Sequence, residues 1–242
     1  MQNKYAGDAG DFGKIGILRS LSSSNLRVGV NWYLVFDEVH NDDGKHTGYL
    51  RDPKFVGCDD ELLGKLGCMV YGNQRSISAI ENMNLIANAT YYHEELLPPQ
   101  TGGSAFRYQW HRNALKKLEA TDIVFLDPDN GLLPKSVAQG SSKSIKYVFE
   151  EEVIDYYLAG HSVIFYNHRC RLDEKTYLNR FQTFFHCESL CDARSFGVKY
   201  VRGTTRDYFF LVHSKHLEQA KKAIQHTLSS NWNQHFKCLS FD

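Results

Sequence analysis

The chain has 242 residues, of which 42% are hydrophobic, 13% aromatic and 23% charged. Its 28 basic residues equal its 28 acidic residues in number, so the formal net charge is zero. This balance excludes a histone-like arm, a generally basic nucleic-acid coat and an acidic disordered tail, although nucleic acid could still bind to a local basic patch.

Two further features place the chain among cytoplasmic proteins. No stretch reaches the ~18 consecutive apolar residues that a membrane helix needs, and the first residues lack the apolar core of a signal peptide. The six cysteines are too sparse in a chain of this length for a disulfide scaffold. We therefore expect a reduced cytoplasmic protein.

The apolar periodicity alternates between strands and helices along the chain. In the first half it predicts strands at 28–37, 68–71 and 90–93 and helices at 59–67, 75–87 and 106–118. In the second half it predicts strands at 122–127, 161–166, 198–202 and 208–212 and helices at 144–158, 176–185 and 214–227. The last two strands are separated by a short turn and so form an antiparallel hairpin.

This order predicts the fold class. Alternating strands and helices build an α/β domain with a mostly parallel sheet covered by helices on both faces, and the hairpin adds one antiparallel strand. We expect one such doubly wound domain over residues 1–242, with 1–25 packed near its ligand site. In open α/β sheets ligands bind beyond the carboxyl ends of the strands, so residues that follow strands are the candidates for function.

The segment DPDNG at 127–131 follows the most apolar predicted strand. Pro128 fixes the φ angle of the turn and Gly131 permits a positive φ. Asp127, Asp129 and Asn130 would then project into the crevice at the strand end. They are candidate catalytic residues, and an ordinary surface turn is the alternative interpretation.

The amino-terminal segment AGDAGDFGK at 6–14 places glycines among charged residues. A glycine-rich loop that opens a helix can present backbone N–H groups to an anion. Asp11 and Lys14 are candidate catalytic residues here, and Gly7 and Asp8 are candidate cofactor ligands. The alternative is a flexible leader followed by a helix cap. The segment is not a P-loop, because Ile15 follows Gly13-Lys14.

Residues at the ends of three other predicted strands are also candidates. His168, Arg169 and Arg171 form a compact basic spot that could hold a phosphate of a nucleic-acid substrate, and Lys199, Arg202 and Arg206 around the hairpin would extend it. A solvated basic turn is the alternative. Asp37 is a carboxylate of the kind that meets the ribose of a nucleotide-type cofactor, and Glu94 either faces a cofactor or belongs to a helix start.

These segments resemble those of a known family. The stretch at 6–14 is similar to the opening AGN-x-[AG]-D-x-x-K signature of the large-ribosomal-RNA adenine methyltransferase J family, with matches at Ala6, Gly7, Gly10, Asp11 and Lys14. Asp127-Pro128 matches the start of that family's Asp-Pro-Pro-Tyr motif. The resemblance implies a Rossmann-like methyltransferase fold, S-adenosylmethionine as cofactor and a nucleic-acid substrate whose amino group meets Asp127.

The chain also departs from that family. Asp129 and Asn130 stand where the second proline and the aromatic residue would orient a flipped base, and no glycine-rich turn follows the first strand. Three hypotheses therefore stay open. One is a methyltransferase in which Asp127 and Asn130 orient the acceptor, and another is an inactive relative that binds a partner. The third is a Mg²⁺- or Mn²⁺-dependent phosphodiesterase with Lys14 stabilising developing charge and a metal held by Asp8, Asp11, Asp127 and Asp129.

Overall fold

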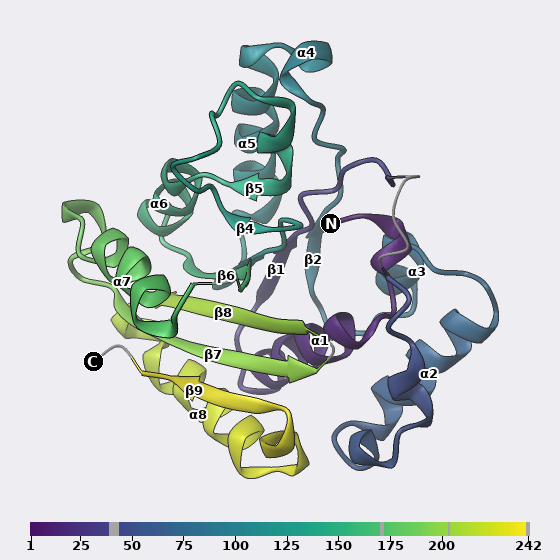
Figure 1. Ribbon diagram of the computed structural model, residues 1–242. Coiled ribbons are helices and arrows are strands. Elements are labelled where there is room, and N and C mark those ends of the chain that lie inside the picture. The colour runs from purple at the N-terminus through teal and green to yellow at the C-terminus, as the bar shows by residue number, and fades with distance from the viewer. Residues whose placement is uncertain (39–43, 170–171, 203, 241–242) are drawn as a thin grey trace.

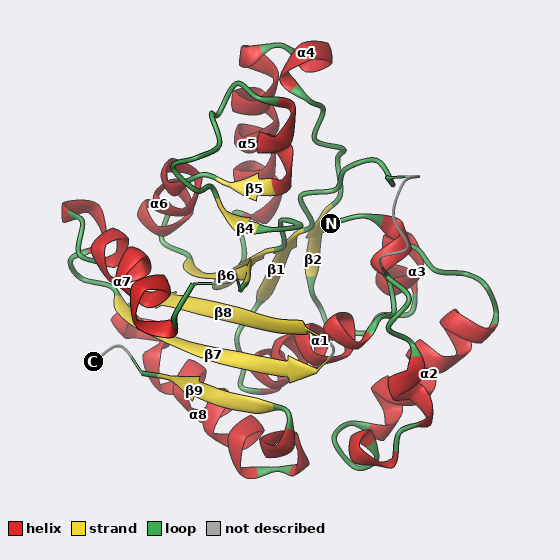
Figure 2. Ribbon diagram, viewed as in Figure 1, coloured by secondary structure: helices red, strands yellow, loops and turns green. Residues whose placement is uncertain are grey.

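A single sheet collects strands from most of the chain (Figures 1 and 2). The computed structural model describes residues 1–38, 44–169, 172–202 and 204–240. Within these residues the sheet has seven strands. In spatial order they are β2 (Thr90–Tyr92), β1 (Val28–Asn31), β3 (Ile123–Leu126), β6 (Ser162–His168), β8 (Thr204–Val212), β7 (Arg194–Arg202) and β9 (Phe236–Leu239).

The strand directions confirm an α/β sheet and correct its predicted composition. Strands β2, β1, β3 and β6 are parallel to one another, whereas β6 with β8, β8 with β7 and β7 with β9 pair antiparallel. The sheet is therefore mixed, and β8 and β9 both run against the other strands, where one reversed strand was predicted. A separate small ladder joins β4 (Gly131–Leu132) to β5 (Tyr147–Val148).

Helices cover both faces of the sheet, as the alternation predicts (Figure 1). One face carries α1 (Ala9–Ser23), α2 (Asp60–Tyr71), α3 (Ile77–Asn82) and α8 (Leu217–Ser229). The other carries α5 (Ser104–Leu118), α6 (Glu150–Leu158) and α7 (Glu174–Phe185), with the short α4 (Pro99–Gly102) before α5. Short 3-10 helices lie at Asn3–Tyr5, Gly48–Arg51, Pro53–Phe55, Ser142–Lys146, Glu188–Leu190, Ser214–His216 and Asn231–Gln234.

The core explains why the strands are apolar on both sides. In β3, Ile123 and Phe125 pack with α1 and α8 on one face, while Val124 and Leu126 pack with α5 and α6 on the other. Alternate side chains of a strand point to opposite faces, so a strand covered twice becomes a continuous apolar run. In the part of the chain that the structure describes, no helix combines the length and apolar character needed to cross a membrane.

Several predicted elements differ from the observed ones. Strand β1 ends at Asn31, whose side-chain oxygen accepts from the Tyr33 N–H in a turn where Tyr33 has a positive φ of 45°. The predicted strand at 68–71 belongs to α2, because Leu62, Leu66 and Met69 continue one buried helical face past the glycines.

Two more differences lie in the second half of the chain. The predicted helix at 144–158 begins only at Glu150, after a 3-10 helix and β5. Its start is fixed by Glu152, whose carboxylate accepts from the Phe149 N–H. Strand β9 was not predicted, since its four residues at the sheet edge are buried only at Phe236 and Leu239.

Candidate active site

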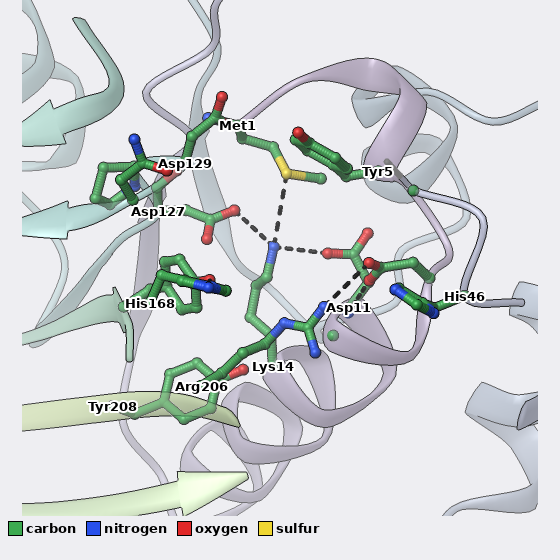
Figure 3. Close-up of a pocket in the computed structure, with 16 residues that line it drawn as sticks. Met1, Tyr5, Asp11, Lys14, His46, Asp127, Asp129, His168, Arg206 and Tyr208 are labelled. Atoms are coloured by element: carbon green, nitrogen blue, oxygen red, sulfur yellow. Dashed lines mark hydrogen bonds and ion pairs between the residues drawn. The ribbon is translucent and has the colours of Figure 1, made fainter. Parts of the chain in front are cut away.

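A pocket of about 390 Å³ lies where α1 begins and where β3 and β6 end (Figure 3). Its lining includes Asp8, Asp11 and Lys14 from the amino-terminal segment together with Asp127, Asp129 and Asn130 from the segment after β3. Two segments separated by more than a hundred residues in the sequence therefore meet in one pocket. The volume lies in the range of about 300–1,000 Å³ that is usual for small-molecule sites.

The turn before α1 fixes two of the carboxylates. Gly7 has a φ of +77°, and its N–H donates to Asp11 Oδ2 at 2.9 Å. Asp8 is the N-cap of α1, and its Oδ1 accepts from the Asp11 N–H at 2.9 Å. This confirms the helix cap that was the alternative interpretation of this segment. Capping by a carboxylate satisfies an otherwise unpaired N–H of the first turn and interacts favourably with the helix dipole.

The glycines of α1 serve packing. A Cβ on Gly10, Gly13 or Gly16 would approach within 2.5–2.7 Å of side-chain atoms of Arg206, Tyr200 and Trp232 respectively. Each glycine thus lets one large side chain lie directly against the helix backbone. Gly10 and Gly13 are inside the helix, so the predicted glycine-rich loop that cradles an anion is wrong for them.

Lys14 is the centre of the charge network in Figure 3. Its Nζ lies 2.6 Å from Asp11 Oδ1 and 2.6 Å from Asp127 Oδ2, and its side chain is 6% exposed. Burial by itself lowers the pKa of Lys14, but the two carboxylates outweigh it and the pKa is raised. Lys14 is therefore a fixed cation. Burial raises the pKa of Asp127, and Lys14 offsets part of that increase.

The turn after β3 is held by its glycine and by neighbouring strands. Gly131 has a φ of +107°, and a Cβ there would lie 2.0 Å from the side-chain oxygen of Asn167. The backbone of Asn130 accepts from the His168 N–H and donates to the carbonyl oxygen of Lys146. The turn can therefore present Asp127, Asp129 and Asn130 in a defined arrangement.

The first two residues lie between the segments that follow β1 and β3. The Met1 amino group donates to the carbonyl oxygens of Tyr33 at 2.8 Å and Asp127 at 3.2 Å, and it lies 2.9 Å from Asp129 Oδ1. Gln2 donates to Asp129 Oδ2 at 2.6 Å. Burial raises the pKa of Asp129, but the Met1 amino group and Gln2 outweigh it, and the pKa is lowered.

The predicted basic spot is divided by the structure. His168 lines the pocket, whereas Arg169 binds Asp207 through two hydrogen bonds of 2.9 and 3.0 Å and also pairs with Glu174. Arg171 lies outside the described residues. Arg206, which was only an extension of this patch, is the arginine that lines the pocket.

Asp37 and Glu94, both predicted to bind the cofactor, lie elsewhere. Asp37 is exposed and accepts from the Lys4 N–H at 3.3 Å. Glu94 is exposed and lines a separate groove with Tyr91 and His93, beside the edge strand β2. Neither residue lines the pocket of Figure 3.

The four aspartates predicted as metal ligands do not form a metal site in this arrangement. Among the described residues, no group of three or more His, Cys, Asp or Glu side chains could hold a metal ion. The reason is that cations of the chain itself occupy the places between the carboxylates. Lys14 lies between Asp11 and Asp127, Arg206 pairs with Asp8, and the Met1 amino group pairs with Asp129.

The sequence did not single out several residues that line the pocket. Tyr166 lies in β6 two residues before its end at His168, and Tyr208 comes from β8, as does Arg206, which was predicted only as an extension of the basic spot. The period-two alternation of β8 puts Arg206 and Tyr208 on one face, which was a usable signal. Their position opposite the amino-terminal segment depends on strand order, which the alternation does not contain.

Comparisons with known proteins add little. No family model matches the sequence. No curated protein matches it either. Among solved structures, one that is similar is the crystal structure of a Legionella pneumophila protein assigned to family DUF519, which is 10% identical, with 97% of each chain covered and a TM-score of 0.48.

Proposed function

We propose that the chain is an S-adenosylmethionine-dependent methyltransferase that acts on nucleic acid, with the pocket as its active site. The observation that carries this is the convergence of 6–14 and 127–130 at the carboxyl end of β3. Strand β1 lies between β2 and β3, so the crevice between β1 and β3 is where the sheet order changes direction. In open α/β sheets that crevice is the ligand site.

The contacts of Met1 support a site for the methionine end of this cofactor. Two carbonyl oxygens and the Asp129 carboxylate surround its amino group, and its sulfur lies 3.9 Å from Lys14 Nζ. S-Adenosylmethionine also carries an α-ammonium group a few bonds from its sulfur, so these acceptors fit it. When bound, the cofactor supplies an electrophilic methyl group. The Met1 amino group occupies these acceptors in this structure, so Asp129 and the carbonyl oxygens of Tyr33 and Asp127 would hold the cofactor's ammonium group only after Met1 has left them.

Asp127 and Asn130 would position the acceptor. Lys14 binds Oδ2 of Asp127, and no described residue bonds its Oδ1. That oxygen can accept a hydrogen bond from an amino group of a base. The Asn130 amide, which also lines the pocket, can both donate and accept. Tyr166, which also lines the pocket, is an aromatic residue of the kind on which a flipped base stacks.

The test is methyl transfer from S-adenosylmethionine with a tritiated methyl group to total RNA and to genomic DNA. We expect incorporation with the unmodified protein and a loss of about 10²–10⁴-fold in Asp127→Asn, the range for removing a positioned acid–base group. Asp122→Asn is the matched control. Asp122 lies just before β3, and its carboxylate pairs with Arg27 outside the pocket.

Cofactor binding is measured separately by thermal unfolding with S-adenosylhomocysteine. At a hundredfold excess over Kd the ligand adds about 2.7 kcal/mol, which for this size of chain raises Tm by about 5–10 °C. A shift without transfer to either nucleic acid would favour the inactive binding protein. The absence of both a thermal shift and methyl transfer would contradict the proposal.

A further inference from the structure

Arg206 makes fewer side-chain hydrogen bonds than Arg107 and Arg169, two other largely buried arginines of the chain. The guanidinium of Arg107 makes four hydrogen bonds, two of them to Glu152, and that of Arg169 is held by two carboxylates. Arg206 donates to the carbonyl oxygen of Arg202 at 3.1 Å and to Asp8 Oδ2 at 3.3 Å, and to no other described residue. A guanidinium has five N–H donors, so several are unused although the side chain is 11% exposed.

The surroundings prevent Arg206 from finding more acceptors by moving. Its guanidinium lies against the first turn of α1, where a Cβ on Gly10 would be 2.5 Å from Nε. Asp8 cannot bind it more closely without loss, because the other oxygen of Asp8 caps α1. The remaining carboxylates of the pocket have cations of their own, since Asp11 and Asp127 share Lys14 and Asp129 binds the Met1 amino group.

A second unpaired donor lies beside Arg206. Tyr208 is fully buried and lines the pocket, and its hydroxyl has no hydrogen-bond partner among the described residues. Burial raises the pKa of Tyr208, so the hydroxyl keeps its proton at neutral pH. A buried donor without an acceptor is unfavourable, and a ligand in the pocket that accepted from this hydroxyl would remove that cost.

We propose that Arg206 and Tyr208 form an oxyanion site at the inner end of the pocket. The unused N–H groups of a guanidinium match two oxygens of a phosphate or carboxylate, and the tyrosine hydroxyl adds a third donor. The source is either a phosphate of nucleic acid or the carboxylate of an amino-acid ligand, and both present the same chemistry. This inference does not rest on methyl transfer, because inorganic phosphate tests it directly.

The experiment is a calorimetric titration of the full chain with inorganic phosphate at constant ionic strength. We expect Arg206→Gln to weaken binding at least tenfold and Tyr208→Phe to weaken it about two- to tenfold, the range for one hydrogen bond. Arg206→Lys keeps the charge without the paired donors and should give an intermediate loss. Arg206→Lys also tests the proposal if Arg206→Gln fails to fold.

Two control variants match these changes. Tyr157→Phe removes another buried hydroxyl without a partner, which does not line the pocket, and Lys237→Gln removes one exposed positive charge. Both should bind phosphate within twofold of the unmodified chain. Absence of phosphate binding to the unmodified chain, or equal binding by the Arg206 variants, overturns the proposal.

The two sources are distinguished by a short single-stranded oligonucleotide and by S-adenosylhomocysteine. If Arg206→Gln weakens only oligonucleotide binding, the site takes a nucleic-acid phosphate. If it weakens only S-adenosylhomocysteine binding, the site takes an amino-acid carboxylate. Phosphate binding that depends on Arg206 in a chain that does not bind S-adenosylhomocysteine would support this site while contradicting the proposed function.

Discussion

Two groups of buried polar side chains lie at opposite ends of the sheet, and they differ in how completely their polar atoms pair. The first is the pocket with Asp8, Asp11, Lys14, Asp127 and Arg206 at the carboxyl ends of the parallel strands. The second, which we call the histidine cluster, comprises His161, His213 and His216 with Ser162 near the amino ends of β3 and β6.

The histidine cluster resembles a catalytic triad in composition only. His216 Nδ1 lies 2.9 Å from Ser162 Oγ, and its Nε2 lies 3.8 Å from Asp122. Ser162 is fully buried, and its hydroxyl also accepts from the His213 N–H at 3.0 Å. A nucleophile needs access to a substrate, whereas this hydroxyl faces only the chain itself.

The two groups show how a ligand site differs from a cluster of polar side chains with a structural role. In the histidine cluster the ring nitrogens bond to Ser162 Oγ and to the carbonyl oxygens of Thr121 and Tyr157. In the pocket, Arg206 and Tyr208 keep donors that no described residue satisfies. Buried groups that pair with one another need no ligand, whereas unpaired donors facing a cavity do.

The largest effect should come from Lys14. Replacing it by Met leaves Asp11 and Asp127 as buried carboxylates without their shared cation. We expect the free energy of unfolding to fall by about 3–5 kcal/mol, as for other broken buried ion pairs. Urea unfolding measures it. Adding Asp127→Asn should recover part of the loss, and a loss below about 1 kcal/mol in Lys14→Met would show that the pair is not formed.

The next effect concerns the packing that supports the pocket. Gly13→Ala places a methyl group 2.7 Å from the ring of Tyr200, so α1 or the ring must move. We expect a loss of about 1–3 kcal/mol by urea unfolding, although alanine is the better helix former. Gly64→Ala in α2 meets no atom within 4 Å and should stabilise by about 0.5–1 kcal/mol. Equal behaviour of the two variants would contradict the packing role.

Much of the sheet could be predicted because its strands are buried on both faces. The runs at 122–127 and 161–166 each contain four consecutive apolar residues, and their observed strands are Ile123–Leu126 and Ser162–His168. Strand β9 lies at an edge and has exposed Lys237 and Cys238, so its sequence carries no comparable pattern.

The site could be predicted in part for a related reason. The rule that ligands bind beyond strand ends pointed to 127–130, and the resemblance pointed to 6–14. Arg206 was ranked below Arg169 because only Arg169 follows a strand directly. In the structure Arg169 turns to Asp207, and Arg206, the preceding residue of β8, faces the pocket. Which face of β8 meets α1 follows from strand order, which one sequence does not reveal.

Ser162→Ala tests whether the histidine cluster has a structural role or acts as a catalytic triad. The change leaves the His213 N–H and the His216 ring nitrogen without their partner. We expect a loss of about 1–2 kcal/mol in urea unfolding, within the range for buried groups left unpaired. Binding of phosphate and of S-adenosylhomocysteine should not change. Lost binding in a variant that remains folded would make the cluster part of the site.

The last effect is a dependence of stability on pH that arises from the same cluster. Burial lowers the pKa of His161, His213 and His216. In the unfolded chain each histidine has a pKa of about 6.5, so above that value both states are neutral and the contribution is fully present. As the pH falls below about 6.5, the unfolded state takes up protons that the folded state does not, and the free energy of unfolding decreases.

The slope can reach about 1.4 kcal/mol per pH unit for each histidine, and urea unfolding between pH 7.5 and 5.5 measures it. Burial raises the pKa of Asp8 and Asp127, which acts in the opposite direction, and His235 adds a slope of the same sign. These groups are unchanged in His161→Gln, so its difference from the unmodified chain isolates the contribution of His161. We expect a shallower slope in that variant, because glutamine does not titrate. Parallel curves would show that His161 does not resist protonation in the folded state.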